Sequence, residues 1–153
     1  MRPQPQILVV DDDPDIVGFL ALVLKQEGYQ VRTATSGREC LGLAREFPPN
    51  LILLDVVMPD FDGVEVCRQI KADPALEGIF VILISGHLTD AESLASGLEG
   101  GADEYLPKPI HQRELVARVR AGLRTQQAME ALRLAHEGLE RRVQERTAQL
   151  AQA

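Results

Sequence analysis

Residues 51–55 read Leu-Ile-Leu-Leu-Asp, a short, bulky apolar run that stops at one carboxylate. Residues 7–10, Ile-Leu-Val-Val, form a similar run that leads into Asp11 and Asp12. Runs of this kind are typical of strands buried on both faces of a parallel sheet. We therefore expect Asp11, Asp12 and Asp55 to lie together at the carboxyl edge of one sheet, where open α/β folds build their sites.

Strands and helices are expected to alternate along the whole chain. Five strands alternating with five helices predict an α/β fold, a doubly wound five-stranded parallel sheet. Asp13 is expected to cap the first helix and Gly28 to end it. The expected strands are 7–10, 31–34, 51–54, 80–84 and 104–106, and the expected helices are near 14–27, 36–46, 64–71 and 90–98 and from Gln112 onward.

Three carboxylates at one edge of a sheet repel each other and require a cation. Oxygen-only ligands are those that Mg²⁺ or Mn²⁺ prefers. Lys108, between Pro107 and Pro109, follows the expected last strand, and Ser85 follows the strand at 80–84. A lysine and a hydroxyl that face an acidic metal pocket can hold a phosphoryl group. The pattern therefore predicts a site at which an aspartate is phosphorylated.

These motifs resemble the receiver domain of two-component response regulators. The resemblance covers about Gln6 to Arg124. It implies the flavodoxin-like strand order 2-1-3-4-5, in which the first and third strands are neighbours. It also implies a histidine kinase or phosphotransfer protein as the partner that supplies the phosphoryl group. The matching segments are 7–12 (Ile-Leu-Val-Val-Asp-Asp), 53–59 (Leu-Leu-Asp-Val-Val-Met-Pro), Asp62-Gly63, Ile84-Ser85-Gly86, 101–103 (Gly-Ala-Asp) and 105–109 (Tyr-Leu-Pro-Lys-Pro).

The resemblance assigns roles around the metal. Asp55 would be the phosphorylation site, attacking the phosphorus of a phosphohistidine. Asp12, Asp55 and the backbone carbonyl of Val57 would bind the metal directly, and Asp11 would bind it through a water. Considered alone, an aspartate at a strand end is more often the cap of a helix or turn. The functional interpretation of Asp55 therefore depends on its neighbours.

Four further residues would bind the phosphoryl group or respond to it. Lys108 would pair first with the nucleophilic aspartate and then with the phosphoryl group. The peptide bond before Pro109 is commonly cis in this family. The Ser85 hydroxyl and the Gly86 N–H would bind phosphoryl oxygens. Tyr105 would be the switch aromatic that turns inward, and a half-buried strand tyrosine is the alternative that stays open.

Two positions are expected to set the lifetime of the phosphate. Val57, two residues after Asp55, offers the phosphoryl group only an apolar side chain. His87, two residues after Ser85, could interact with an attacking water or lie in solvent.

Two other functions compete with this interpretation. Phosphatases of the haloacid dehalogenase type also use an aspartate nucleophile, a lysine and Mg²⁺. They need a second aspartate two residues after the nucleophile, where this chain has Val57. A dimeric scaffold with a receiver fold, in which phosphorylation is incidental, stays open. We expect no enzyme activity beyond the domain's own phosphorylation and dephosphorylation.

The last expected helix continues beyond the receiver domain, which we place at residues 1–124. A helix from Gln112 to Leu150 would be about 58 Å long, roughly twice the width of such a domain. Residues 125–153 would then form a coiled coil that leads to an output domain or forms a homodimer. Five of the eight seam positions are apolar, the positions being Met129, His136, Val143 and Leu150, with Thr125, Leu132, Leu139 and Arg146.

Net charge and hydropathy limit the kinds of partner that we expect. Residues 1–110 hold 8 Lys and Arg against 18 Asp and Glu, a net charge of −10, whereas residues 111–153 hold 8 Arg against 5 Glu. An acidic body predicts that this domain contacts no nucleic acid. No stretch approaches the roughly eighteen apolar residues of a membrane span, and the N-terminus lacks a signal-peptide core. We therefore expect a cytoplasmic protein without a membrane partner, with Cys40 and Cys67 reduced.

Overall fold

The computed structural model describes residues 4–60, 62–86, 95 and 100–152. Its five strands form one sheet in the order β2-β1-β3-β4-β5, with every neighbouring pair parallel, as predicted. The predicted helix at 90–98 lies outside the described residues except for Ala95, which is helical. The elements are β1 (Gln6–Val10), α1 (Pro14–Gln26), β2 (Gln30–Ala34), α2 (Gly37–Glu46), β3 (Leu51–Asp55), α3 (Gly63–Ala72), β4 (Phe80–Ser85), β5 (Glu104–Pro107) and α5 (Gln112–Gln152).

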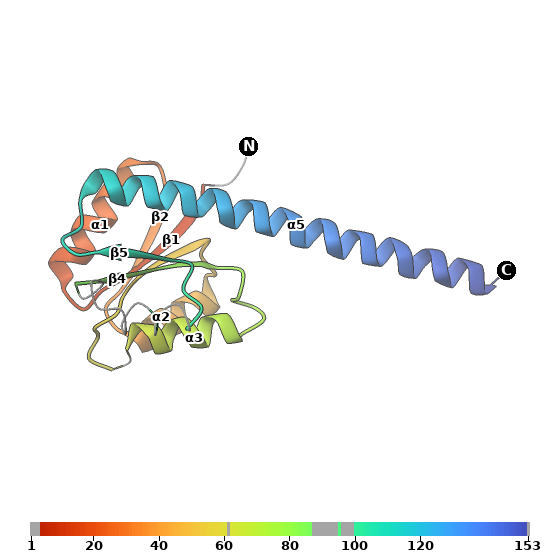
Figure 1. Cartoon of the computed structure of the whole chain (residues 1–153), viewed down its shortest axis with the longest axis horizontal. Helices are drawn as coiled ribbons and strands as arrows, with labels where there is room; N and C mark the ends of the chain where they lie inside the picture. The colour runs from red at the N-terminus through yellow and green to blue at the C-terminus, as the bar shows by residue number, and fades with distance from the viewer. Residues whose placement is uncertain (1–3, 61, 87–94, 96–99, 153) are drawn as a thin grey trace.

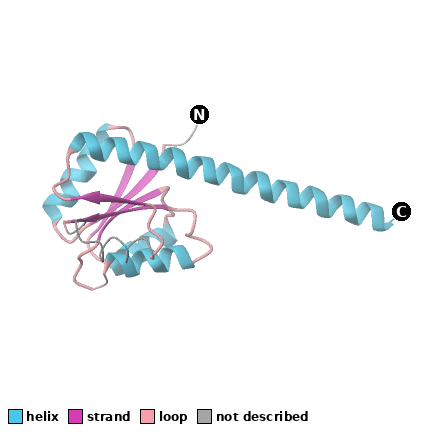
Figure 2. Ribbon diagram, in the orientation of Figure 1, coloured by secondary structure: helices cyan, strands magenta, loops and turns pink. Residues whose placement is uncertain are grey.

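Helices cover both faces of the sheet, as Figures 1 and 2 show. The face with α1 and α5 takes Leu51 and Leu53 of β3, and the face with α2 and α3 takes Ile52 and Leu54. All four side chains have no exposed surface. A strand buried on both faces has no reason to alternate apolar and polar residues, which explains its continuous apolar run.

The ends of α1 follow the sequence signals. The Asp13 carboxylate accepts a hydrogen bond of 2.9 Å from the backbone N–H of Asp15, which makes Asp13 the cap of α1. Gly28 has a φ of 91°, a left-handed conformation that ends helices and favours glycine. Both predictions are confirmed.

Helix α5 is one continuous helix of 41 residues, about 60 Å long. Its first part packs against the sheet through Leu115, Val119 and Leu123, and Gln126 is its last buried residue. Beyond that point the helix projects away from the sheet (Figure 1). The prediction of a long projecting helix is confirmed.

The start of the projecting part of α5 is held at the amino edge of the sheet. Asn50 Nδ2 donates a hydrogen bond of 3.3 Å to Gln126 Oε1, and Asn50 Oδ1 accepts one of 2.8 Å from the Gln6 backbone N–H. A Cβ at Gly122 would lie 2.7 Å from the Phe80 ring and 3.0 Å from Leu51 Cδ1. Glycine therefore lets α5 lie directly on the sheet at this level.

The two cysteines are buried in the core beneath α2 and α3. Neither forms a disulfide. Burial raises the pKa of the Cys40 thiol to about 12 and that of Cys67 to about 11, so both thiols stay protonated and unreactive. Within the described residues, no helix combines the length and apolar character needed to cross a membrane.

Candidate functional site

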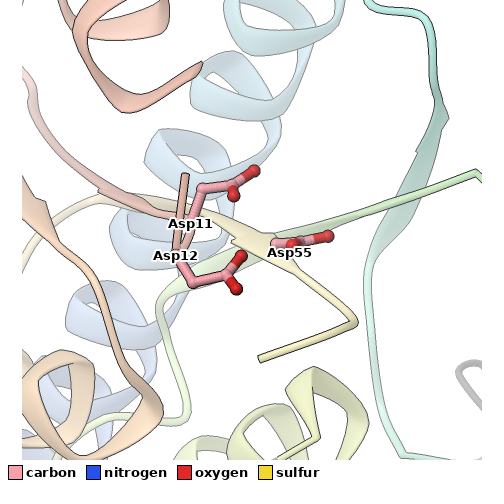
Figure 3. Close-up of side chains that lie close together, drawn as sticks. All are labelled: Asp11, Asp12 and Asp55. Carbon is pink, nitrogen blue, oxygen red and sulfur yellow. The ribbon is translucent and has the colours of Figure 1, made fainter. Parts of the chain in front are cut away.

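The register of the sheet brings the predicted residues to one edge. Val10 of β1 pairs with Leu54 of β3, so the residues that follow, Asp11 and Asp55, lie side by side. Asp55 pairs in turn with Ile84 of β4. Figure 3 shows the side chains of Asp11, Asp12 and Asp55 close together at the ends of β1 and β3. Parallel strands thus gather residues that are more than forty positions apart in the chain, at the edge where such folds bind ligands.

The three carboxylates are close enough to share one ion. One oxygen from each of Asp11, Asp12 and Asp55 lies within 4.8 Å of the other two. Asp11 and Asp55 are almost fully buried, with 1% and 4% of their surface exposed, whereas Asp12 is exposed. Two buried carboxylates therefore lie within 4.8 Å of a third, an arrangement that is unfavourable without a cation.

Lys108 supplies one positive charge to this pocket. Its Nζ lies 3.3 Å from Asp55 Oδ1 and 3.5 Å from Asp11 Oδ2. Its backbone N–H donates a hydrogen bond of 3.0 Å to the Ser85 carbonyl, which ties the loop to the end of β4. The Lys108–Pro109 peptide bond is cis, as the family resemblance implied.

One lysine does not satisfy the pocket. The Asp13 backbone N–H donates to Asp11 Oδ1 at 3.0 Å, but Asp11 Oδ2 is buried and accepts no hydrogen bond within the described part of the chain. Three carboxylates against one ammonium leave an excess of negative charge. Carboxylate oxygens grouped within 4.8 Å of one another are the kind of ligand that Mg²⁺ or Mn²⁺ takes. Asp11, Asp12 and Asp55 therefore fit a divalent cation.

The pKa shifts of Asp55, Asp11 and Lys108 reflect the same excess of negative charge. Burial raises the pKa of Asp55, and the nearby charge of Asp11 raises it further, against the opposing effects of Lys108 and a hydrogen bond from the Val57 backbone. Burial also raises the pKa of Asp11, only partly offset by the Asp13 N–H and Lys108. Burial alone would lower the pKa of Lys108, but Asp55 and Asp11 together outweigh it and raise the pKa. The lysine therefore stays charged.

The remaining predicted residues surround the pocket at different depths. Ser85 is buried at the end of β4, and Gly86 follows it on the surface. Tyr105 on β5 is half-buried and packs against the core cluster on the side of α2 and α3. The Val57 side chain is 63% exposed. His87 lies outside the described residues.

Two features of the turn after β3 carried no functional prediction. Gly63 is the first residue of α3, and its N–H donates a hydrogen bond of 2.7 Å to the Val56 carbonyl. A Cβ at Gly63 would lie 2.3 Å from the Asp55 carbonyl oxygen and 2.8 Å from Val56 Cα, so only glycine fits. The adjacent Asp60 binds the start of α2, a contact that no local sequence pattern signals.

Comparison with known proteins identifies the family. Residues 7–120 match the Response regulator receiver domain family over most of the chain. The chain belongs to the response regulator receiver domain family. Among solved structures, a CheY-like response regulator receiver domain protein from Methanospirillum hungatei is similar, with a TM-score of 0.78 and 30% identity over 83% of this chain and 99% of that one.

Two curated relatives show which proteins carry similar domains. The DNA-binding response regulator MtrA of Mycolicibacterium smegmatis is 43% identical over 119 residues, which are 78% of this chain and 50% of MtrA. The transcriptional regulatory protein AfsQ1 of Streptomyces coelicolor is 44% identical over 120 residues, which are 78% of this chain and 52% of AfsQ1. The chain thus spans about half the length of these relatives.

These relatives correct one prediction. The acidic charge of residues 1–110 led us to exclude nucleic acid as a partner, and the name of MtrA states that it is DNA-binding. The prediction that this domain contacts no nucleic acid was wrong, because a protein with a similar domain is DNA-binding and the net charge of residues 1–110 does not decide the partners. An acidic receiver domain is compatible with a protein that binds DNA.

Proposed function

We propose that this domain accepts a phosphoryl group on Asp55 from the phosphohistidine of a partner histidine kinase, in a reaction that depends on Mg²⁺. The observation that carries the proposal is the pocket itself. Three carboxylates share it within 4.8 Å, and Lys108 Nζ lies 3.3 Å from Asp55 Oδ1. A structural pocket of this kind would be unfavourable for folding, since it buries unpaired negative charge. A phosphoryl-transfer site needs that charge to hold its metal.

The transfer is a single displacement at phosphorus. A carboxylate oxygen of Asp55 forms the new P–O bond, the P–N bond to the histidine breaks, and the imidazole nitrogen keeps the electron pair. Mg²⁺ bound by Asp11, Asp12, Asp55 and the carbonyl of Val57 would neutralise charge on the phosphoryl oxygens. The product is an acyl phosphate.

Charged and polar groups of the pocket then hold the product. The Lys108 ammonium, paired with Asp55 and Asp11 before the reaction, follows the new negative charge on the phosphoryl group. The Ser85 hydroxyl and the Gly86 N–H, at the end of β4, would donate to phosphoryl oxygens. Movement of Ser85 toward the phosphoryl group would draw Tyr105 inward and change the surface formed by β5, α5 and the helix predicted at 90–98. The exposed Val57 side chain and His87 would set the lifetime.

Dephosphorylation is the only other reaction we propose for the chain. An aspartate-nucleophile phosphatase places a second carboxylic acid two residues after the nucleophile to protonate the leaving group. Val57 occupies that position here, and its side chain cannot donate a proton. The protein is thus proposed to turn over only its own phosphoryl group.

The projecting part of α5 is proposed as a coiled-coil linker to an output domain, and as the site of dimer formation. Its seam residues Met129, Leu139 and Leu150 are 58–67% exposed, an apolar stripe that a second helix would cover. Ion pairs along the helix, such as Arg133 with Glu137 at 2.7 Å, support its helical state in water.

If the projecting helices pair in a dimer, truncation after Gln127 should give a monomer, as measured by light scattering. Cytoplasmic localisation stays a prediction.

Beryllofluoride binding tests the proposed site directly. Beryllofluoride mimics a phosphoryl group on aspartate without being hydrolysed, so the result does not depend on phosphate lifetime. We expect Mg²⁺-dependent binding that moves the NMR signals of Ser85, Gly86 and Lys108 in the wild-type protein. Asp55→Asn should show none of these changes. Saturable binding to Asp55→Asn, or no binding to the wild-type chain, would contradict the proposal and favour a scaffold role.

A further inference from the structure

Asp60 joins the turn after β3 to a different helix. Its Oδ1 accepts a hydrogen bond of 2.9 Å from the Gly37 backbone N–H, and its Oδ2 accepts one of 2.9 Å from the Arg38 backbone N–H. These are the first two amides of α2, more than twenty residues earlier in the chain. The local cap Ser36 takes only the next amide, since its side chain accepts the N–H of Glu39 at 3.1 Å.

The contact is favourable on physical grounds. The first amides of a helix have no partner within the helix, and the positive end of the helix dipole attracts a carboxylate. Hydrogen bonds to an ionised acceptor are stronger than neutral ones. Because each oxygen of Asp60 binds a different amide, the carboxylate is fixed in orientation as well as in position.

The turn that Asp60 fixes is the one that leaves the phosphorylation site. It starts directly after Asp55, where the Val56 N–H donates a hydrogen bond of 3.1 Å to the Ile84 carbonyl. Met58 packs against the core cluster, while the Val57 side chain is exposed. The Val57 side chain therefore does little to hold its own backbone. Besides the hydrogen bond from the Val57 backbone to Asp55, the flanking residues of the turn hold it in place.

We propose that Asp60 is a positioning residue for the Mg²⁺ site: by binding the Gly37 and Arg38 amides it anchors the turn that carries Val57 against α2. The inference rests on the proposed function, because it assigns to Asp60 the placement of a metal-binding backbone group. Core packing of Met58 fixes one side of the turn, and the bond to α2 fixes the other. Loss of the Asp60 carboxylate releases the second anchor without removing any of the metal-binding carboxylates of Asp11, Asp12 and Asp55.

A matched pair of variants separates positioning from simple helix capping. Asp60→Ala and Ser36→Ala each remove a cap from the same end of α2, and the two should lower the free energy of unfolding to a similar extent. Only Asp60→Ala also detaches the turn. We expect Mg²⁺ affinity, measured by titration, to fall about tenfold in Asp60→Ala and to stay within about twofold of wild type in Ser36→Ala. Asp60→Asn, which keeps one acceptor oxygen, should recover part of the loss.

The metal-free protein provides a second readout. The backbone amide NMR signals of Val56, Val57 and Met58 should move in Asp60→Ala and keep their positions in Ser36→Ala. If both variants behave alike in Mg²⁺ affinity and in these signals, Asp60 is a helix cap only and the inference is overturned. If the wild-type protein binds no Mg²⁺, the proposed function fails, and the metal-free signals alone decide whether Asp60 positions the turn.

Discussion

The two edges of the sheet differ in the polar side chains that the same strands carry. At the carboxyl edge, Asp11 and Asp55 are buried with more negative charge than Lys108 can pair. At the amino edge, Asn50 and Gln126 are neutral, and their hydrogen bonds join β1, β3 and α5. The first edge is left electrostatically incomplete and needs a ligand. At the second, neutral side chains hydrogen-bond one another and the backbone, and they hold the start of the projecting helix.

The comparison shows how function can be separated from stability in this fold. Unpaired buried charge at the carboxyl edge destabilises the metal-free protein, since both aspartates have raised pKa values. Satisfied neutral bonds at the amino edge contribute stability without chemistry. Substitutions at the first edge should therefore change ligand binding, and substitutions at the second should change only folding and the direction of α5.

The largest expected effect comes from two glycines, one at each edge. Gly63→Ala would place a Cβ 2.3 Å from the Asp55 carbonyl oxygen, and the backbone there cannot move without displacing the site. We expect a loss of about 3 kcal/mol in the free energy of unfolding, together with lost Mg²⁺ binding. Chemical denaturation and Mg²⁺ titration measure the two effects.

Gly122→Ala is the counterpart at the amino edge. Its Cβ would meet the Phe80 ring and a Leu51 methyl, which are side-chain atoms that can shift. The loss should be smaller than in Gly63→Ala, with Mg²⁺ binding intact. Gly42→Ala, in open space on α2, should gain up to about 1 kcal/mol and serves as the control for helix propensity. Equal losses in Gly63→Ala and Gly122→Ala would contradict the difference between the edges.

The next effect is stabilisation by Mg²⁺. At a concentration of about 100 times its dissociation constant, Mg²⁺ should raise the free energy of unfolding of the wild-type protein by about 2.7 kcal/mol. Asp11→Asn and Asp12→Asn should lose most of this gain, whereas Gln126→Ala should keep it. Thermal unfolding with Mg²⁺ and with a chelator tests this, and a full Mg²⁺ effect in Asp11→Asn would place the metal elsewhere.

The same aspartates predict a pH dependence in the absence of metal. Burial raises their folded-state pKa values above the ordinary value of an aspartate, so the native state binds more protons than the unfolded state in that pH range. The contribution of these groups to stability is then greatest at low pH and falls as the pH rises through their folded pKa values. Asp55→Asn should gain stability relative to wild type as the pH is raised from 4 toward 7. Parallel pH profiles for the two proteins would contradict the raised pKa.

The smallest effect on stability is expected at the amino edge of the sheet. Gln126→Ala removes one hydrogen bond to Asn50 and should lower the free energy of unfolding by about 1 kcal/mol, with phosphorylation unchanged. A double-mutant cycle with Asn50→Ala isolates the pair and should give a coupling of about 0.5–1 kcal/mol. No coupling would mean that α5 is held by apolar packing alone.

The sequence predicts the carboxyl edge far better than the amino edge. Local patterns mark this edge in the sequence: apolar runs end at aspartates, and Lys108 lies between two prolines. The grouping of Asp11, Asp12 and Asp55 follows from strand order, because parallel strands end at the same edge. The length of α5 also follows from local signals, since no proline interrupts residues 112–152.

Contacts between distant polar residues left no such signal. Asn50, Gln126 and Asp60 each occur in ordinary loop or helix contexts, and their partners are fixed only once the sheet and helices have packed. The need for glycine at position 63 likewise appears only in the structure, because α3 begins too close to the Asp55 backbone for a side chain. The prediction that this domain contacts no nucleic acid was wrong for a related reason, since it depended on the net charge of residues 1–110 alone.

The most direct test of the carboxyl edge as a phosphorylation site is the intact mass of the protein after incubation with acetyl phosphate, with and without Mg²⁺. We predict one phosphoryl adduct in the wild-type chain, dependent on Mg²⁺, absent in Asp55→Asn and retained in the amino-edge variant Gln126→Ala. An adduct that persists in Asp55→Asn, or that forms equally without Mg²⁺, would contradict the assignment of Asp55 as the phosphoryl acceptor of a metal-dependent site.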